Sequence, residues 1–234
     1  MMKRTLVVVS LVCLTGIAHA KNVNSWTGVY GGLNAGGIFN TAYIKSNNLG
    51  FTRPDGTCDT NANFASFFPG VQLGYARQFN NRVVLGLEAD YTNNVNKQGN
   101  ANCTCDVTPT VSDKFVVKNQ QQGSLRGRIG YAFNNHWLPF VTAGGSVAGL
   151  GVNYRDEGGD YYSMNGARAG WLVGAGVEWR FAQSWSIRTE YYYIAYNNAL
   201  KMGIPVTYGL NDPNGKARVN LNANNVRAAI NYWF

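Results

Sequence analysis

Long apolar runs, charged residues, proline and histidine are all scarce in this chain. Beyond residue 20 no segment reaches the length of uncharged apolar sequence that a membrane helix requires, which excludes a helical membrane protein. Only 14% of the residues are charged and only 6 are proline, whereas there are 28 glycines, 14 tyrosines, 11 phenylalanines and 6 tryptophans. This mixture is typical of many short strands that carry aromatic residues and have no thick apolar core.

Residues 1–20 have the pattern of a secretory signal peptide. Lys3 and Arg4 form a basic start, the apolar stretch that follows is too short to span a bilayer as a helix, and a small-x-small cleavage site ends at Ala20. We therefore predict cleavage after Ala20 and export of one domain, residues 21–234.

Eight segments of the exported part alternate between apolar and polar residues. A period of two is the repeat of a β-strand with one apolar and one polar face. In the last segment Phe234, Tyr232 and Ile230 share the apolar face, whereas Asn231 and Arg227 lie on the other. The segments are approximately 27–45, 67–79, 82–92, 121–133, 138–153, 168–181, 185–196 and 219–234. The sequence thus predicts an all-β chain.

Three of these segments alternate less cleanly. Segments 27–45 and 138–153 are rich in glycine, and the direction of their faces is left open. In segment 67–79, Arg77 falls on the face that carries Tyr75 and Phe79 and interrupts its apolar character.

The links between the segments alternate in length. Three are short enough for hairpin turns: Asn80-Asn81, residues 134–137 and residues 182–184. The others are long and polar, at residues 46–66, 93–120, 154–167 and 197–218. Short turns at one rim and long loops at the other indicate an outer-membrane barrel. We predict an eight-stranded antiparallel up-and-down transmembrane β-barrel, with both termini in the periplasm and the long loops outside the cell.

Aromatic residues gather near the short turns and the chain ends. In an eight-stranded meander these points share one rim, where an aromatic belt meets the membrane–water interface, and a soluble β-sandwich gives no reason for this coincidence. The residues are Trp26, Phe79, Phe133, Trp137, Trp179, Phe181, Trp185, Trp233 and Phe234.

Both ends of the exported chain resemble a known family. The run from Trp26 to Gly37, WTGVYGGLNAGG, is similar to the opening of the small opacity-type outer-membrane antigens, and the ending from Asn225 to Phe234 is similar to their closing strand. That family includes alphaproteobacterial surface antigens and hemin-binding proteins. The resemblance implies an eight-stranded barrel related to the OmpA type and a role as surface antigen, adhesin or porin-like protein.

Nine charged residues fall on the polar faces of the predicted strands. Eight strands enclose a lumen just wide enough for side chains to fill, and buried charges must be paired. We therefore expect a structural salt-bridge network, with a narrow ion pathway as the alternative. The residues are Glu88, Asp90, Arg126, Arg128, Glu178, Arg180, Arg188, Glu190 and Arg227.

The sequence argues against an enzyme. Glu88 and Asp90 have a spacing that suits acid–base chemistry, but arginines inside a barrel would neutralise them. Of the two histidines, His19 leaves with the signal peptide and His136 falls in a predicted periplasmic turn, which excludes a histidine-dependent site at the outer rim.

The three cysteines that follow the predicted signal peptide lie in the predicted outer loops. Export exposes them to an oxidising compartment, so we expect Cys58 to form a disulfide with Cys103 or Cys105. These cysteines lack the spacing of a zinc site, and residues 156–160 lack that of an EF-hand, so no metal is predicted.

We therefore predict a non-enzymatic surface protein whose loops act as an antigenic or adhesive platform, with a structural role in the outer membrane. Expected partners are outer-membrane lipid, lipopolysaccharide and host surface molecules, but not nucleic acid. We expect the barrel-assembly machinery to recognise Phe234, Tyr232 and Ile230 as an insertion signal. No cofactor is expected. The alternatives are a small porin or ion channel, and a hemin-binding protein, since a phenolate of Tyr161, Tyr162 or Tyr208 can ligate haem iron.

Overall fold

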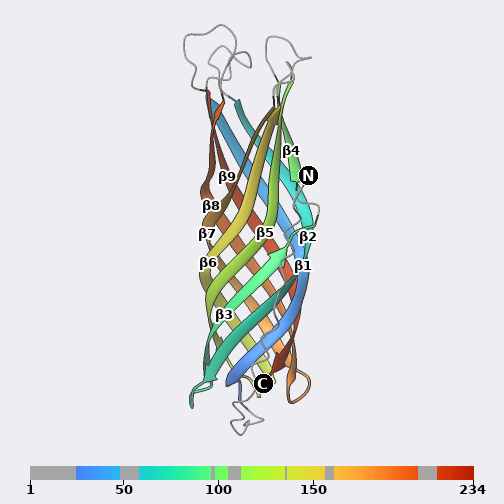
Figure 1. Cartoon of the computed structure of the whole chain (residues 1–234). Helices are drawn as coiled ribbons and strands as arrows, with labels where there is room; N and C mark the ends of the chain where they lie inside the picture. The colour runs from blue at the N-terminus through green and yellow to red at the C-terminus, as the bar shows by residue number, and fades with distance from the viewer. Residues whose placement is uncertain are drawn as a thin grey trace.

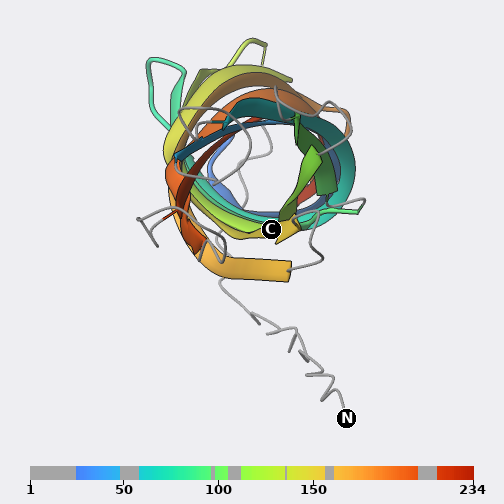
Figure 2. The same ribbon diagram turned by 90° about the horizontal axis from the view of Figure 1, so that it is seen from above.

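A computed structural model describes residues 25–47, 58–95, 98–104, 112–134, 136–155, 161–204 and 215–234. Their strands run obliquely around one axis (Figure 1), and the view from above in Figure 2 shows them as a closed ring. Within these ranges no helix is long and apolar enough to cross a membrane. The strands are β1 Gly28–Asn47, β2 Cys58–Gln78, β3 Val83–Asn93, β4 Gln98–Thr104, β5 Ser112–Tyr131, β6 Trp137–Arg155, β7 Tyr161–Arg180, β8 Trp185–Ile204 and β9 Gly215–Trp233.

The strands form an eight-stranded antiparallel barrel. β1 pairs with β2 on one side and with β9 on the other, which closes the sheet on itself. β3 and β4 pair one after the other with β5, so together they occupy one strand position. The break follows Asn93, where the Val95 amide donates to the Phe67 carbonyl at 2.7 Å. The predicted fold class is confirmed.

The lower half of the barrel, which carries the hairpin turns and the C-terminus in Figure 1, has an apolar outside and a polar inside. On β9, Val226 and Ile230 are exposed, whereas Arg227 and Asn231 are buried. Lipid chains can solvate the first pair but not the second. This half is therefore built to lie in a bilayer.

In the upper half the polarity of the two faces is reversed. On β9, Val219 and Leu221 point inwards and are buried, while Asn220 and Asn222 point outwards. Buried apolar residues from other strands complete this upper interior, including Ile44, Phe115, Leu150 and Ile194. An apolar interior behind a polar wall is the packing of a protein surrounded by water. The barrel thus continues well beyond the lipid-facing band.

These extensions correct the predicted loop boundaries. β2 begins at Cys58 and β7 at Tyr161, and β8 continues to Ile204, all inside stretches that the sequence suggested were loops. In these extensions the apolar residues lie on the inner face and the polar residues on the outer face, which is the reverse of the lower half. The polar outer residues therefore resemble loop sequence.

Two of the nine predicted belt residues are not in the belt. Seven are exposed at the lower rim, but Trp26 and Trp233 are 0% and 1% exposed and lie inside the barrel. Their rings pack edge to face at 5.4 Å between centroids. Because both residues lie near a turn or a chain end, the sequence predicted the correct rim for them. It did not determine whether their side chains point outwards or into the barrel.

A second aromatic level marks the other edge of the lipid-facing band. On β7, Trp179 lies at the lower level and Trp171 at the upper one, and both are exposed. The stretch from Trp171 to Trp179, both included, is close to the about 9–11 residues that a tilted strand needs to cross a bilayer. The upper level also contains Phe39, Phe67, Tyr91 and Tyr193.

The glycines of β6 show which face each of its residues occupies. Gly144 points inwards, and a Cβ there would overlap the carbonyl oxygen of Leu125 and lie 2.6 Å from the Cα of Arg126. Gly145 points outwards, and its nearest neighbour would be the Gly170 carbonyl oxygen at 4.0 Å. Gly144 is therefore required for the close approach of β5 to β6, and Gly145 is not.

Gly144→Ala should lower the free energy of unfolding by roughly 1–3 kcal/mol, because the added methyl group overpacks the interior. The matched substitution Gly145→Ala should change it by less than about 0.5 kcal/mol. Urea unfolding of the detergent-folded protein measures both, and equal stability of the two variants would contradict the assigned facing.

Candidate functional site

The structure places all nine predicted lumen charges inside the barrel. Their side chains are between 0% and 8% exposed, and they come from β3, β5, β7, β8 and β9. Strand register sets several of them opposite one another: Glu88 faces Arg126, Glu178 faces Arg188, and Glu190 faces Arg227. Which side chains pair is decided by contacts across the lumen as well as along the wall.

Glu88 is the centre of this network. Its carboxylate lies 2.5 Å from nitrogen atoms of both Arg126 and Arg188, 3.1 Å from Arg227 and 3.4 Å from Arg128. Arg188 reaches it across the barrel, because β8 and β3 lie on opposite walls. One carboxylate therefore ties four strand positions together through charge-assisted hydrogen bonds.

Two further carboxylates, those of Glu190 and Asp90, lie beside this centre. Glu190 lies 3.1 Å from Arg126 and 2.9 Å from Arg227. Asp90 lies 2.9 Å from Arg126 and accepts a hydrogen bond from the Ser124 hydroxyl at 2.5 Å. Arg227 also lies 3.7 Å from Asp90. Each of these two arginines is thus shared among three carboxylates, and the network is continuous.

Glu178 holds the part of the network nearer the lower rim. It accepts hydrogen bonds from Arg128 at 2.7 Å, from Ser186 at 2.6 Å and from the Asn231 amide at 2.9 Å. The indole N–H of Trp233 donates to the same Ser186 hydroxyl at 3.0 Å. The ionic network therefore connects directly to the aromatic residues below it.

Arg180 differs from the other four arginines. Within the described residues it has no carboxylate within salt-bridge distance; its guanidinium donates to the Ser25 carbonyl at 2.9 Å. It lies 4.0 Å from the centre of the Trp26 ring and 5.2 Å from that of Trp233. Cation–π contact with two indoles replaces an ion pair and closes the lower end of the barrel.

The interior is filled at three successive levels. Trp26, Trp233 and Arg180 occupy the lower end, the ionic network occupies the middle, and the apolar residues of the upper half follow. Near the upper edge of the network, the guanidinium groups of Arg126 and Arg227 lie over the face of the Tyr192 ring, 5.4 and 5.2 Å from its centre. This arrangement leaves the charged groups packed together and shielded from bulk solvent.

Such an arrangement does not suit catalysis. Glu88 and Asp90 are engaged by arginines and shielded from solvent, so neither is presented to a substrate. His136 lies at a lower turn with its Nδ1 3.2 Å from the Arg180 carbonyl oxygen. In the described part of the chain, no group of three or more His, Cys, Asp or Glu side chains could hold a metal ion.

Several predicted residues lie at or beyond the limits of the described residues. Cys105 and Tyr208 lie outside them, as do residues 1–20, so the signal peptide stays a prediction. Cys58 and Cys103 belong to β2 and β4, and Tyr161 and Tyr162 begin β7, but their side chains are not among those described. Hemin binding through these tyrosines also stays a prediction.

The proposed insertion signal occupies the outer face of the last strand. Phe234, Tyr232 and Ile230 are all exposed, and β9 is the strand that closes on β1. Their recognition by the assembly machinery stays a prediction.

Neutral partners of the network were missed from the sequence. The Tyr30 hydroxyl donates to Glu88 at 2.7 Å and accepts from Arg128 at 2.8 Å. Tyr30 belongs to the glycine-rich first segment, whose facing the alternation left open. Ser186 shares the inward phase of Arg188 and Glu190, so its position on the polar face was a usable signal.

Comparison with known proteins agrees with this geometry. Residues 6–234 match the family described as the outer membrane protein beta-barrel domain. The chain belongs to this family. The resemblance to small outer-membrane barrel antigens is therefore confirmed, and so is a location in the bacterial outer membrane.

Relatives of this outer-membrane barrel protein include two immunogenic proteins of Brucella. The 31 kDa outer-membrane immunogenic protein of Brucella melitensis is 29% identical over 224 residues, which cover 90% of this chain and 84% of the relative. The 25 kDa outer-membrane immunogenic protein of Brucella ovis is 32% identical over 176 residues, covering 75% and 72%. The solved outer membrane protein OprG from Pseudomonas aeruginosa aligns at 13% identity with a TM-score of 0.44, over 89% of this chain and 97% of that protein.

Replacing the central carboxylate tests the network. Glu88→Gln should lower the free energy of unfolding by roughly 3 kcal/mol or more, because the guanidinium groups around it lose their shared counter-charge. Lys114→Gln, which removes an exposed charge, should change it by less than about 0.5 kcal/mol. Urea titration of the detergent-folded protein gives both values.

A second substitution separates loss of pairing from general damage. Arg188→Gln should cost less in the Glu88→Gln background than alone, since the two groups interact directly. Strict additivity of the two costs would argue against the pairing.

Proposed function

We propose that this outer-membrane barrel is a non-enzymatic platform that presents its long connecting loops outside the cell, and that the barrel body helps to maintain the membrane. The observation that carries this proposal is the water-adapted upper half. A tilted strand needs about 9–11 residues to cross a bilayer, whereas β7 has 20. About half of a strand of this length is left to hold the loop ends away from the membrane.

The proposed orientation follows from the two rims. The hairpin turns and the C-terminus share the lower rim, and the links from β1 to β2, β4 to β5, β6 to β7 and β8 to β9 start and end at the other rim (Figure 1). Outer-membrane barrels carry short turns in the periplasm and long loops outside. The names of the Brucella relatives, which call them immunogenic, support exposure of these loops at the cell surface.

The charge of the upper wall supports contact with lipopolysaccharide. The four carboxylates whose side chains are described all face the lumen, whereas Lys114 and Arg155 are exposed on the outside. These two residues lie directly opposite each other on β5 and β6. Like charges in such a position repel, so a phosphate between them would relieve a local cost.

The filled lumen is the reason we favour a platform over a porin. Ions would have to pass the buried apolar residues of the upper half, the buried ionic network and the Trp26–Arg180–Trp233 group. Porins, in contrast, conduct through a water-filled lumen.

Binding to host cells tests the platform directly. Cells that display the intact protein should bind an epithelial surface, and versions with residues 48–57, 105–111, 156–160 or 205–214 shortened should lose most of that binding while still folding. Pure protein in a planar bilayer should show no steady conductance, and hemin titration should give no Soret shift. If all the shortened versions bound as well as the intact protein, the platform would be refuted. Stable conductance would then favour a channel, and a saturable Soret shift would favour a hemin-binding protein.

A disulfide between Cys58 of β2 and Cys103 or Cys105 would stabilise the platform. The Thr60 hydroxyl of β2 donates to the Asn102 carbonyl of β4 at 3.4 Å, so the two strands are adjacent here. Cys58 precedes Thr60 by two residues and Cys103 follows Asn102, and backbones of adjacent strands are close enough for a disulfide.

Peptide mapping without reduction should therefore find Cys58 bonded to Cys103 or Cys105 in protein purified from the membrane. Cys58→Ser should release a second free thiol. Three free thiols in the unaltered protein would refute the disulfide.

A further inference from the structure

Arg77 is a cation on the lipid-facing wall of the barrel. Tyr75 and Phe79 lie two residues before and after it, Leu85 lies opposite it on β3, and all three are exposed. No carboxylate in the described part of the chain pairs with it, and its guanidinium lies 5.4 Å from the centre of the Phe79 ring. A cation among apolar neighbours requires either water or an anion, and its flexible stem lets it reach the nearest interface.

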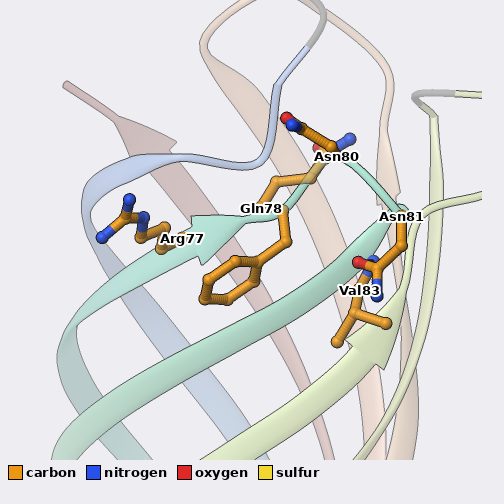
Figure 3. Close-up of a pocket in the computed structure, with 6 residues that line it drawn as sticks. Arg77, Gln78, Asn80, Asn81 and Val83 are labelled. Atoms are coloured by element: carbon orange, nitrogen blue, oxygen red, sulfur yellow. Dashed lines mark hydrogen bonds between the residues drawn. The ribbon is translucent and has the colours of Figure 1, made fainter.

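The tip of the hairpin next to Arg77 contains a hollow of about 450 Å³. Its lining combines an apolar part, from Phe79 and Val83, with the side chains of Gln78, Asn80 and Asn81 around the turn (Figure 3). The hollow is therefore amphipathic, with the guanidinium of Arg77 at one side.

Two contacts hold this hairpin tip in place. The Gln78 side-chain oxygen accepts from the Trp26 amide at 2.8 Å, which joins the tip to the interior aromatic group. The Asn81 side-chain oxygen accepts from the Val83 amide at 3.2 Å, which leaves the N–H groups of that carboxamide to donate elsewhere. Polar donors and the cation are thus presented together at a fixed turn.

The depth of this hollow identifies its ligand class. Phe79 belongs to the lower aromatic belt, and such belts lie at the level of lipid headgroups. A guanidinium with nearby amide donors is suited to a phosphate, and the exposed Leu73 and Leu87 continue as an apolar track for acyl chains.

We propose that the β2–β3 hairpin, through Arg77 and the hollow beside it, binds the headgroup phosphate of a glycerophospholipid in the periplasmic leaflet. The choice of leaflet rests on the orientation proposed above; the site itself does not depend on the role of the loops. The phosphates of lipid A share this chemistry, but in that orientation they lie at the opposite rim.

Native mass spectrometry of the full exported chain, folded in detergent, tests the site with three probes. Phosphatidylglycerol should bind, and diacylglycerol with the same acyl chains, which lacks the phosphate, should bind much more weakly. Arg77→Gln should weaken phosphatidylglycerol binding about tenfold, because a charge-assisted contact is lost. Arg77→Lys should have a smaller effect, because it keeps the charge but loses the planar fork.

Arg218→Gln is the matched control, because it removes an exposed arginine of β9 that belongs to neither proposed phosphate site and should leave phosphatidylglycerol binding unchanged. Arg155→Gln should weaken the binding of the third probe, lipid A. Heat-dependent mobility on gels confirms that each variant is folded, and Arg77→Lys decides the question if Arg77→Gln does not fold. Unchanged phosphatidylglycerol affinity in the folded Arg77 variants, or equal binding of diacylglycerol, would overturn the site. A loss of lipid A binding in Arg77→Gln as large as the loss of phosphatidylglycerol binding would overturn the assignment to a glycerophospholipid. Neither result bears on loop-mediated cell binding.

Discussion

Glu88 accepts hydrogen bonds from arginines on three other strands, and the interior of the barrel is organised around this carboxylate. A strand that slipped by one residue would move its arginine from the lumen into lipid and leave the carboxylates with too little positive charge. The network therefore couples the registers of β3, β5, β8 and β9 to one another. Its side chains also occupy the middle of the lumen, so the same interaction that specifies the fold is a reason why we propose a platform rather than a channel.

A second constraint concerns the polarity of each strand, because lipid surrounds the lower half of the barrel and water surrounds the upper half. Below the upper aromatic level the outside must be apolar and the inside polar; above it the reverse holds. β9 makes this change between Ala223, which is buried, and Val226, which is exposed, without leaving the sheet. Continuous pairing with β1 carries the strand through both environments, and this gives the loops a rigid support.

The two rims have different chemistry, and this difference supports a division of roles. At the lower rim, Trp26 and Trp233 close the interior around Arg180, while the hairpin carrying Arg77 faces the lipid. At the upper end, basic residues such as Lys114 and Arg155 stand on the outer wall beneath the loop connections. We infer that the barrel body interacts with lipid at both levels and that recognition is left to the loops, which vary without changing the scaffold.

Much of the fold followed from local features of the sequence. Alternation places successive side chains on opposite faces, so Arg227 and Asn231 could be placed inside, and Ile230 and Phe234 outside, without knowledge of any neighbouring strand. Short links such as Asn80-Asn81 then gave the order of the strands, and the balance of inward arginines and carboxylates indicated a paired network. Tertiary structure decided the rest. Arg188 meets Glu88 across the lumen, Tyr30 joins them from β1, and Trp26 turns inwards, because contacts between residues far apart in the chain depend on the stagger of every strand pair around the barrel.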